Sequence, residues 1–174
     1  SEELDTIGPH SFGGRLDGPF TAHPKICPLT GEMLAFGYGF LPSEYLTFLR
    51  VSATGELVQQ KNIDIPAPVM MHDFNITASR VVFMDLPVVF DLEVAITGGM
   101  PFSFQPDNGA RLGVMNREDG DAEVQWLDID PCYVFHPVNS YDVDDRVVID
   151  VARYPKVWEA GSSEFETRAN LWRW

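Results

Sequence analysis

Histidine is the residue type in this chain best suited to metal chemistry, and the sequence contains four of them: His10, His23, His72 and His136. A neutral imidazole binds transition metals such as iron, and it suits a site that stays open to a gas and an apolar substrate. His72 and His136 each lie within an apolar run, and Pro24 keeps the chain at His23 extended. Because a buried, unpaired ring costs about 1–3 kcal/mol, these three histidines need a partner.

The elements that must position these rings are predicted to be β-strands. Short runs of β-branched and aromatic residues alternate with turn signals, and no run extends into a helical period of several turns. The first three runs form a meander, a second group follows, and Pro101 opens a long loop before a third group. The predicted strands are 33–40, 45–51, 57–65, 69–74, 80–85, 87–92, 111–116, 123–129, 133–139 and 146–154. Residues 158–167 are predicted to form a surface loop, and 170–174 to begin a further strand.

The strand density is typical of a sandwich, a barrel or a propeller, and the spacing favours the last. The groups repeat at roughly the 40–50 residues of a propeller blade, although no signature repeats within them. His23 and His72 are 49 residues apart, and His72 and His136 are 64 apart, which places one histidine on each successive blade. Since the innermost strands line the axis, the three rings should converge on one point. We therefore predict an all-β chain of about three blades.

Three stretches around these histidines resemble signature sequences of the carotenoid cleavage oxygenase family. They are Thr21–Lys25 with Thr30–Glu32, Met70–Thr77, and Phe135–Asn139. Further matching stretches are Gly13–Leu16, Gly109–Gly113 and Asp150–Tyr154, so the resemblance covers nearly the whole chain in order and spacing.

The resemblance implies a seven-bladed β-propeller that holds Fe(II) through four histidines. Three of them would be His23, His72 and His136, with the fourth beyond Trp174 and the family's second-shell glutamates outside the stretches that match. Residue 1 is Ser, and the chain stops where a strand begins, so residues 1–174 are expected to be one partial domain, truncated at both ends and with little activity alone.

The implied reaction is the cleavage of a C=C bond of a carotenoid or apocarotenoid by O2, giving two carbonyl products. Two alternatives stay open. One is a stilbene-cleaving dioxygenase of the same family, and the other is a non-catalytic β-propeller binding module with structural histidines. A calcium-dependent propeller hydrolase is disfavoured, because the acidic residues lie mostly in turns rather than in a ligand ring.

Two positions depart from the family pattern. His10 stands where the family generally has a non-ligating aromatic residue, so we predict that it is not a ligand. Cys27 stands where an Asp is usual, four residues after His23, and is either a bystander or tunes this loop. Asp73 is predicted to be a local cap. Most phenylalanines are predicted to be core residues, with Phe102 and Phe104 as the best candidates for lining a substrate tunnel.

The overall composition narrows the partners. The formal charge is −14 without any Lys/Arg cluster, which argues against nucleic acid and leaves a small, neutral or apolar ligand. The family resemblance implies that this ligand is an apolar, conjugated molecule and that O2 is the second substrate. No apolar run approaches the roughly 20 residues of a membrane-spanning helix, although peripheral membrane contact stays open. Cys27 and Cys132 lack a metal-binding or disulfide pattern, so we expect buried, reduced thiols and a cytoplasmic location.

Overall fold

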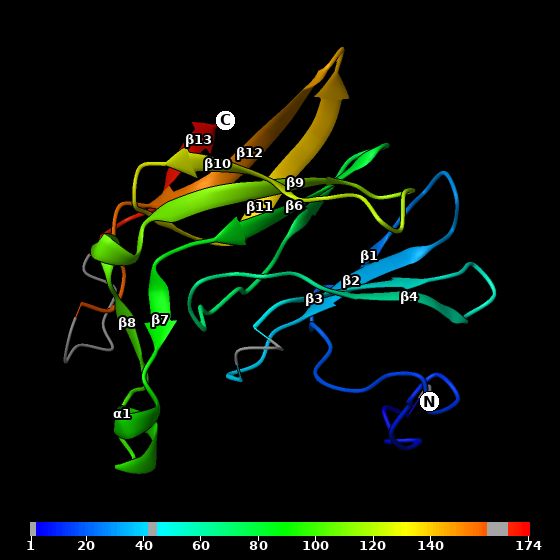
Figure 1. Ribbon diagram of the computed structural model, residues 1–174, viewed down its shortest axis with the longest axis horizontal. Coiled ribbons are helices and arrows are strands. Elements are labelled where there is room, and N and C mark those ends of the chain that lie inside the picture. Colours follow the sequence, from blue (N-terminus) through cyan, green and yellow to red (C-terminus); the bar gives the residue numbers. More distant parts are fainter. Residues whose placement is uncertain (1–2, 42–44, 160–166) are drawn as a thin grey trace.

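The fold is described by a computed structural model that covers residues 3–41, 45–159 and 167–174. Antiparallel strands form three main sheets and one separate hairpin, and the only α-helix in these ranges has five residues (Figure 1). The elements are β1 (Lys25–Ile26), β2 (Met33–Gly37), β3 (Thr47–Val51), β4 (Leu57–Asn62), β5 (Asn75–Ile76), β6 (Arg80–Asp85), β7 (Val88–Phe90), α1 (Leu92–Ile96), β8 (Phe102–Phe104), the 3-10 turn η2 (Pro106–Asn108), β9 (Ala110–Asn116), β10 (Gln125–Ile129), β11 (Tyr133–Val143), β12 (Arg146–Tyr154) and β13 (Asn170–Arg173).

The first sheet is the predicted meander with one short strand added. Its order is β1-β2-β3-β4, and β2 pairs with β3 over its whole length, with Phe36 opposite Phe48. Both phenylalanines are fully buried. The Phe36 ring packs on Phe74 and the Phe48 ring on Phe83 of the second sheet, so this face of the first sheet is its inner face.

The second sheet corrects the predicted grouping of the strands. Its order is β10-β9-β6-β5, so strands from the second and third predicted groups share one sheet. Asp85 at the end of β6 pairs with Arg111 of β9 in register and through an ion pair of 2.7 Å. The chain between them leaves the sheet, forms the β7–β8 hairpin and returns. Apolar residues of this hairpin pack into the core that the second sheet shares with the third.

Two local predictions in this region were wrong. Residues 69–74 are extended but form no strand of their own, since only Val69 makes a bridge, to Val89. The predicted long loop contains β8. Before it lies an unpredicted helix, α1, which Asp91 caps by accepting bonds from the N–H groups of Glu93 and Val94. Phe102 and Phe104 therefore lie on a strand and not on a loop.

The third sheet has the order β11-β12-β13, and the predicted strand at the end of the chain is confirmed as β13. Of the predicted surface loop, residues 160–166 lie outside the described part of the chain. Trp158 was predicted to lie in this surface loop, but its ring packs against that of Phe135, with the ring centroids 5.6 Å apart.

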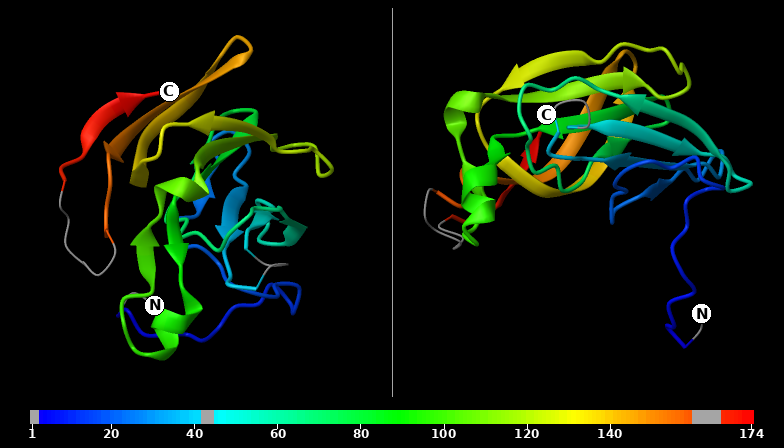
Figure 2. Two further views of the ribbon diagram at one scale, coloured as in Figure 1. Left: turned by 60° about the vertical axis from the view of Figure 1, so that its left-hand side comes forward. Right: turned by 60° about the horizontal axis from the view of Figure 1, so that its bottom comes forward.

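The second sheet is buried on both faces, which explains the unbroken apolar run in β6. Val81 and Phe83 point into a core shared with the first sheet, whereas Val82 and Met84 point into a core shared with the third. Successive residues of a strand face opposite sides, so one strand fills two cores. The three sheets therefore stand face to face in sequence order (Figure 2), as neighbouring blades of a propeller do.

The inner strands of the three sheets meet on one side. Residues of β1, β5 and β11 line a common cleft, and β5 and β11 lie in contact. His23 precedes β1, His72 precedes β5, and His136 lies in β11, so each sheet brings its histidine at its first strand. Among the described residues, no helix has the length and apolar character that a membrane crossing requires.

Candidate metal centre

His23 is held by a short loop that is fixed to the first sheet. The backbone N–H of Thr21 donates to the Phe36 carbonyl of β2 at 2.7 Å, and the Thr21 hydroxyl accepts the His23 N–H at 3.0 Å. This local turn of a threonine side chain onto a backbone two residues on sets the direction in which the His23 ring leaves the chain.

His72 lies on the extended segment before β5. The segment is paired at its start, where the Met70 N–H donates to the Val88 carbonyl at 2.8 Å. Met71 and Asp73 on either side of His72 are buried. Because side chains alternate in an extended chain, the His72 ring points to the opposite side, where it is half-buried.

His136 lies at an irregularity of β11. The register of β11 against β12 shifts between Val134 and Pro137, which is the pattern of a β-bulge. Pro137 lacks a backbone N–H, and bulges accept such residues and redirect the side chains beside them. The bulge therefore aims the His136 ring away from the regular alternation of the strand.

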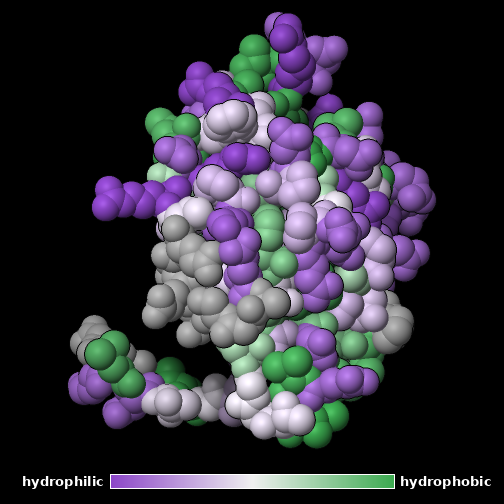
Figure 3. All heavy atoms as spheres, turned by 90° about the vertical axis from the view of Figure 1, so that its left-hand side faces the viewer, coloured by the Kyte–Doolittle hydropathy of each residue, from purple (hydrophilic) through white to green (hydrophobic). Residues whose placement is uncertain are grey.

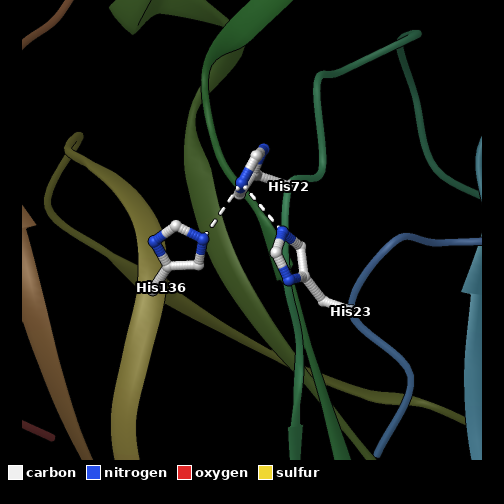
Figure 4. A group of neighbouring side chains, drawn as sticks. All are labelled: His23, His72 and His136. Carbon is white, nitrogen blue, oxygen red and sulfur yellow. Dashed lines mark hydrogen bonds between the residues drawn. The ribbon is translucent and has the colours of Figure 1, made fainter. Parts of the chain in front are cut away.

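The structure brings the three predicted histidines together from the three sheets (Figure 4). The Nε2 atom of His72 lies 3.1 Å from the Nε2 atoms of both His23 and His136. The three donor atoms all lie within 4.8 Å of one another. Two metal–nitrogen bonds of about 2.1 Å at a right angle hold their nitrogens roughly 3.0 Å apart, so the two separations of 3.1 Å are those of neighbouring ligands on one ion.

The electrostatics of the cluster favour a neutral His72 ring, the form that binds metals. Burial lowers the pKa of His72, the neighbouring His136 and His23 lower it further, and Asp73 acts in the opposite direction. Within the described residues, the candidate metal cluster contains no carboxylate. A donor set of imidazoles alone fits an ion such as iron, copper or zinc and is unsuited to calcium or magnesium. That these rings bind iron stays a prediction.

His10 is absent from the cluster, in agreement with its predicted exclusion. It is exposed, and its ring packs against Phe12 at 4.5 Å. Asp73 accepts the N–H of the adjacent Phe74 at 2.8 Å within an extended segment, where no helix or turn begins. Its carboxylate also binds Lys25 Nζ at 2.7 Å, so it joins the His72 segment to β1 as well.

Sequence reasoning missed a second tie at the site. The Tyr133 hydroxyl donates to the Met70 carbonyl at 2.9 Å, although Tyr133 is 1% exposed. Tyr133 lies in β11 three residues before His136, and Met70 lies two residues before His72, so this bond connects the segments of the two histidines. The signal was present, since a buried Tyr hydroxyl requires a hydrogen-bond partner, but the sequence does not say which one.

A cleft of about 470 Å³ opens beside His23 and His72. Its apolar lining comes from side chains that were predicted to be core residues, Phe20 and Phe40, together with Tyr38. Phe40 is 46% exposed. Phe102 and Phe104 are not among the residues that line this cleft, and their place in a substrate tunnel stays a prediction.

Phe102 belongs instead to an aromatic cluster next to the cleft. Phe40 stacks on Phe90 with ring centroids 3.8 Å apart, and Phe102 lies 5.5 Å from Phe90. Apolar side chains also gather over α1 and the β7–β8 hairpin, at the lower end of the face in Figure 3, where Leu92 and Ile96 are exposed. The candidate site thus opens next to an apolar surface.

Comparison with known proteins identifies the family. The family model described as RPE65, retinal pigment epithelial membrane protein, matches residues 1–174. A carotenoid cleavage oxygenase of Mycobacterium tuberculosis is 32% identical over 100% of this chain and 44% of its own length. Carotenoid 9,10(9',10')-cleavage dioxygenase 1 of Phaseolus vulgaris is 38% identical over 97% of this chain and 32% of its own length.

Solved structures give the same answer for the fold. Lignostilbene dioxygenase of Pseudomonas brassicacearum superposes with a TM-score of 0.85 at 32% identity, over 98% of this chain and 38% of that one. A cobalt-substituted Synechocystis ACO superposes with a TM-score of 0.81 at 25% identity, over 98% and 39%. Carotenoid oxygenases are β-propellers, so the predicted partial propeller is confirmed. The chain spans less than half the length of these relatives, and it belongs to the RPE65 and carotenoid cleavage oxygenase family.

Proposed function

We propose that this chain is the part of an Fe(II)-dependent dioxygenase that supplies three of its four iron ligands, His23, His72 and His136. The substrate is a carotenoid or apocarotenoid, and O2 cleaves one of its C=C bonds. The observation that carries the proposal is the pair of 3.1 Å separations that join the three Nε2 atoms. The family resemblance assigns the fourth ligand to a histidine beyond Trp174.

The side chains of this chain fit each requirement of that reaction. The three imidazoles hold the ion, and bound Fe(II) supplies the activation of O2. Tyr133 and Asp73 fix the segment of His72 against its neighbours, and the supports behind a ligand commonly tune metal affinity. The cleft lined by Phe20, Tyr38 and Phe40 receives an apolar chain beside the rings. The C=C and O=O bonds break and two C=O bonds form, so the reaction needs no reductant.

A stilbene is the second candidate substrate, and one observation favours it. The lignostilbene dioxygenase matches this chain with a TM-score of 0.85 at 32% identity, which is as similar as the Mycobacterium tuberculosis oxygenase at 32%. The histidine cluster serves either substrate equally, because it acts on the O2 and the alkene rather than on what surrounds the alkene.

The experiment uses the whole protein that contains this chain. Iron is measured per protein in the wild type, in His72→Ala and in His10→Ala as the matched control. We expect close to one iron per wild-type molecule, loss of the iron in His72→Ala, and retention in His10→Ala, whose ring lies outside the cluster. Retention of stoichiometric iron by His72→Ala would refute the metal site and leave a binding module with structural histidines.

The substrate is decided by incubating the iron-loaded whole protein separately with an apocarotenal and with a hydroxystilbene. Two carbonyl products from the apocarotenal support the proposal. Aldehydes from the stilbene alone would transfer the assignment to the stilbene-cleaving branch of the family.

A further inference from the structure

Arg117 is a buried cation whose charge is not balanced by a carboxylate of its own. It directly follows β9 and is 2% exposed. The carboxylate that faces it is that of Glu32, whose Oε2 lies 3.9 Å from Arg117 Nη2, beyond hydrogen-bond range. A guanidinium stays protonated at every accessible pH, and a charge removed from water needs a counter-charge.

Glu32 is also shared with a second guanidinium. Its Oε1 lies 3.7 Å from Arg50 Nε, and Arg50 donates to the Arg117 carbonyl at 3.1 Å. One carboxylate thus faces two cations, which leaves one positive charge uncompensated in a largely buried place.

Cys27 is the group that can supply the missing negative charge. The Arg117 Nη2 donates to Cys27 Sγ at 2.8 Å, a shorter distance than to the Thr30 hydroxyl at 3.5 Å. The Cys27 side chain is 2% exposed.

The surroundings of the thiol agree with this role. Burial alone raises the pKa of Cys27, but hydrogen bonds from the Thr30 hydroxyl, from Arg117 and from the backbone of Thr30 and Leu29 outweigh it and lower the pKa to about 7. Cys132 shows the contrast, because burial raises its pKa.

Two other charged groups line the same cleft, and both have partners elsewhere. Lys25 binds Asp73 at 2.7 Å. Asp142 accepts bonds from the hydroxyls of Thr77 and Ser79 at 2.9 and 3.0 Å. Asp142 is therefore not the counter-ion of Arg117, and Lys25, itself a cation, cannot be one.

The position of the pair gives it a function. Cys27 directly follows β1, which leads from His23, and the Arg117 Nη1 donates to the carbonyl of Thr77, which directly follows β5 and leads from His72. One guanidinium therefore donates hydrogen bonds to residues at the ends of β1 and β5, the inner strands of two sheets. The sheets carry the two rings whose Nε2 atoms lie 3.1 Å apart.

We propose that Cys27 is a thiolate that neutralises the buried Arg117 guanidinium, and that this pair positions the His23 and His72 segments relative to each other. The role in metal binding rests on the proposed function, whereas the charge pair does not. Protonation of the thiolate, or its replacement by a neutral group, leaves Arg117 without a counter-ion and loosens the junction of the two sheets.

The first measurement needs no metal. The ultraviolet absorbance of thiolate is followed in the metal-free whole protein from about pH 5 to about pH 10, which brackets the ordinary thiol pKa. The wild type and the control Cys132→Ala should show a thiolate that forms near pH 7, and Cys27→Ser should lack that step. A Cys27 thiol that titrates at its ordinary value of about 8.5 or above would overturn the pairing, whatever the protein does with iron.

The second measurement is iron affinity, by competition with a chelator at pH 8. Cys27→Ser should bind iron about tenfold more weakly, as expected for loss of a support behind a ligand. Cys27→Asp, which keeps the charge, should bind iron within about threefold of the wild type. In the ultraviolet titration this variant should lack the thiolate step near pH 7. Equal affinity of Cys27→Ser and the wild type would overturn the positioning role. A wild type that shows the thiolate but takes up no iron would refute the proposed function and, with it, the positioning role, and would leave only the charge pair.

Discussion

The tie between Tyr133 and Met70 offers a sharp test of how the histidine segments are held together. In Tyr133→Phe the ring stays and fills the same space, so no cavity forms and only the hydroxyl is lost. The bond removed is the 2.9 Å hydrogen bond to the Met70 carbonyl, made by a side chain that is 1% exposed. A net hydrogen bond contributes about 1 kcal/mol, and a partner left unsatisfied away from water costs about 1–3 kcal/mol. We therefore expect a loss of about 1–2 kcal/mol in the free energy of unfolding.

The assay is urea unfolding of the metal-free whole protein, in which the midpoint should fall while the slope stays the same. Tyr141→Phe is the matched control, because Tyr141 lies on the same strand and is 36% exposed; its effect should stay within about 0.5 kcal/mol. Tyr133→Phe should also bind iron more weakly than the wild type, since the lost bond connects the segments of His72 and His136. If Tyr133→Phe is as stable as the control, the hydroxyl does not hold these segments and the argument fails.

Two further predictions concern the loop of His23 and the charge of the cluster. Gly37 lies where an added Cβ would overlap the Pro19 carbonyl, so Gly37→Ala should displace the loop that carries His23, lower the free energy of unfolding by about 1–3 kcal/mol and reduce bound iron. The control is Gly120→Ala, where an added Cβ meets only side-chain atoms at 3.7 Å or more. Normal iron content in Gly37→Ala would contradict the packing argument. The pKa of His72 is lowered by burial and then by its two neighbouring rings. As the pH falls through about 6.5, His72 therefore binds a proton in the unfolded chain but not yet in the folded one. The metal-free protein should lose stability as the pH falls from about 6.5 towards the folded pKa. Urea midpoints at successive pH values check this, and the same pH dependence in His72→Ala would show that another group is responsible.

The donor set could be predicted from the sequence because it is a matter of residue type and local context. His23, His72 and His136 lie in extended or apolar stretches, and their spacing of about one blade placed them on successive sheets; the structure brings their donor atoms within 4.8 Å. The exclusion of His10 rested instead on the family resemblance.

The supports behind the donors could not be predicted in this manner. The sequence shows that Tyr133, Cys27 and Arg117 exist, but it does not show that Tyr133 meets a carbonyl 63 residues away or that Arg117 meets a thiol 90 residues away. Cys27 was expected to be a small buried hydrophobe that is either a bystander or tunes the His23 loop, because its basic neighbour Arg117 lies 90 residues further along the chain.

What the sequence alone determined is the strand character of the chain and the three rings that converge. Alternation of apolar residues and the choice of His are local properties, readable without knowledge of the neighbours. The tertiary structure decided which strands share a sheet, as when β6 pairs with β9 across the inserted β7–β8 hairpin. It also decided the bulge that aims His136. The physical reason is that strand partners are selected by burial between segments far apart in the chain, and β6 can fill two cores only once both neighbouring sheets are in place.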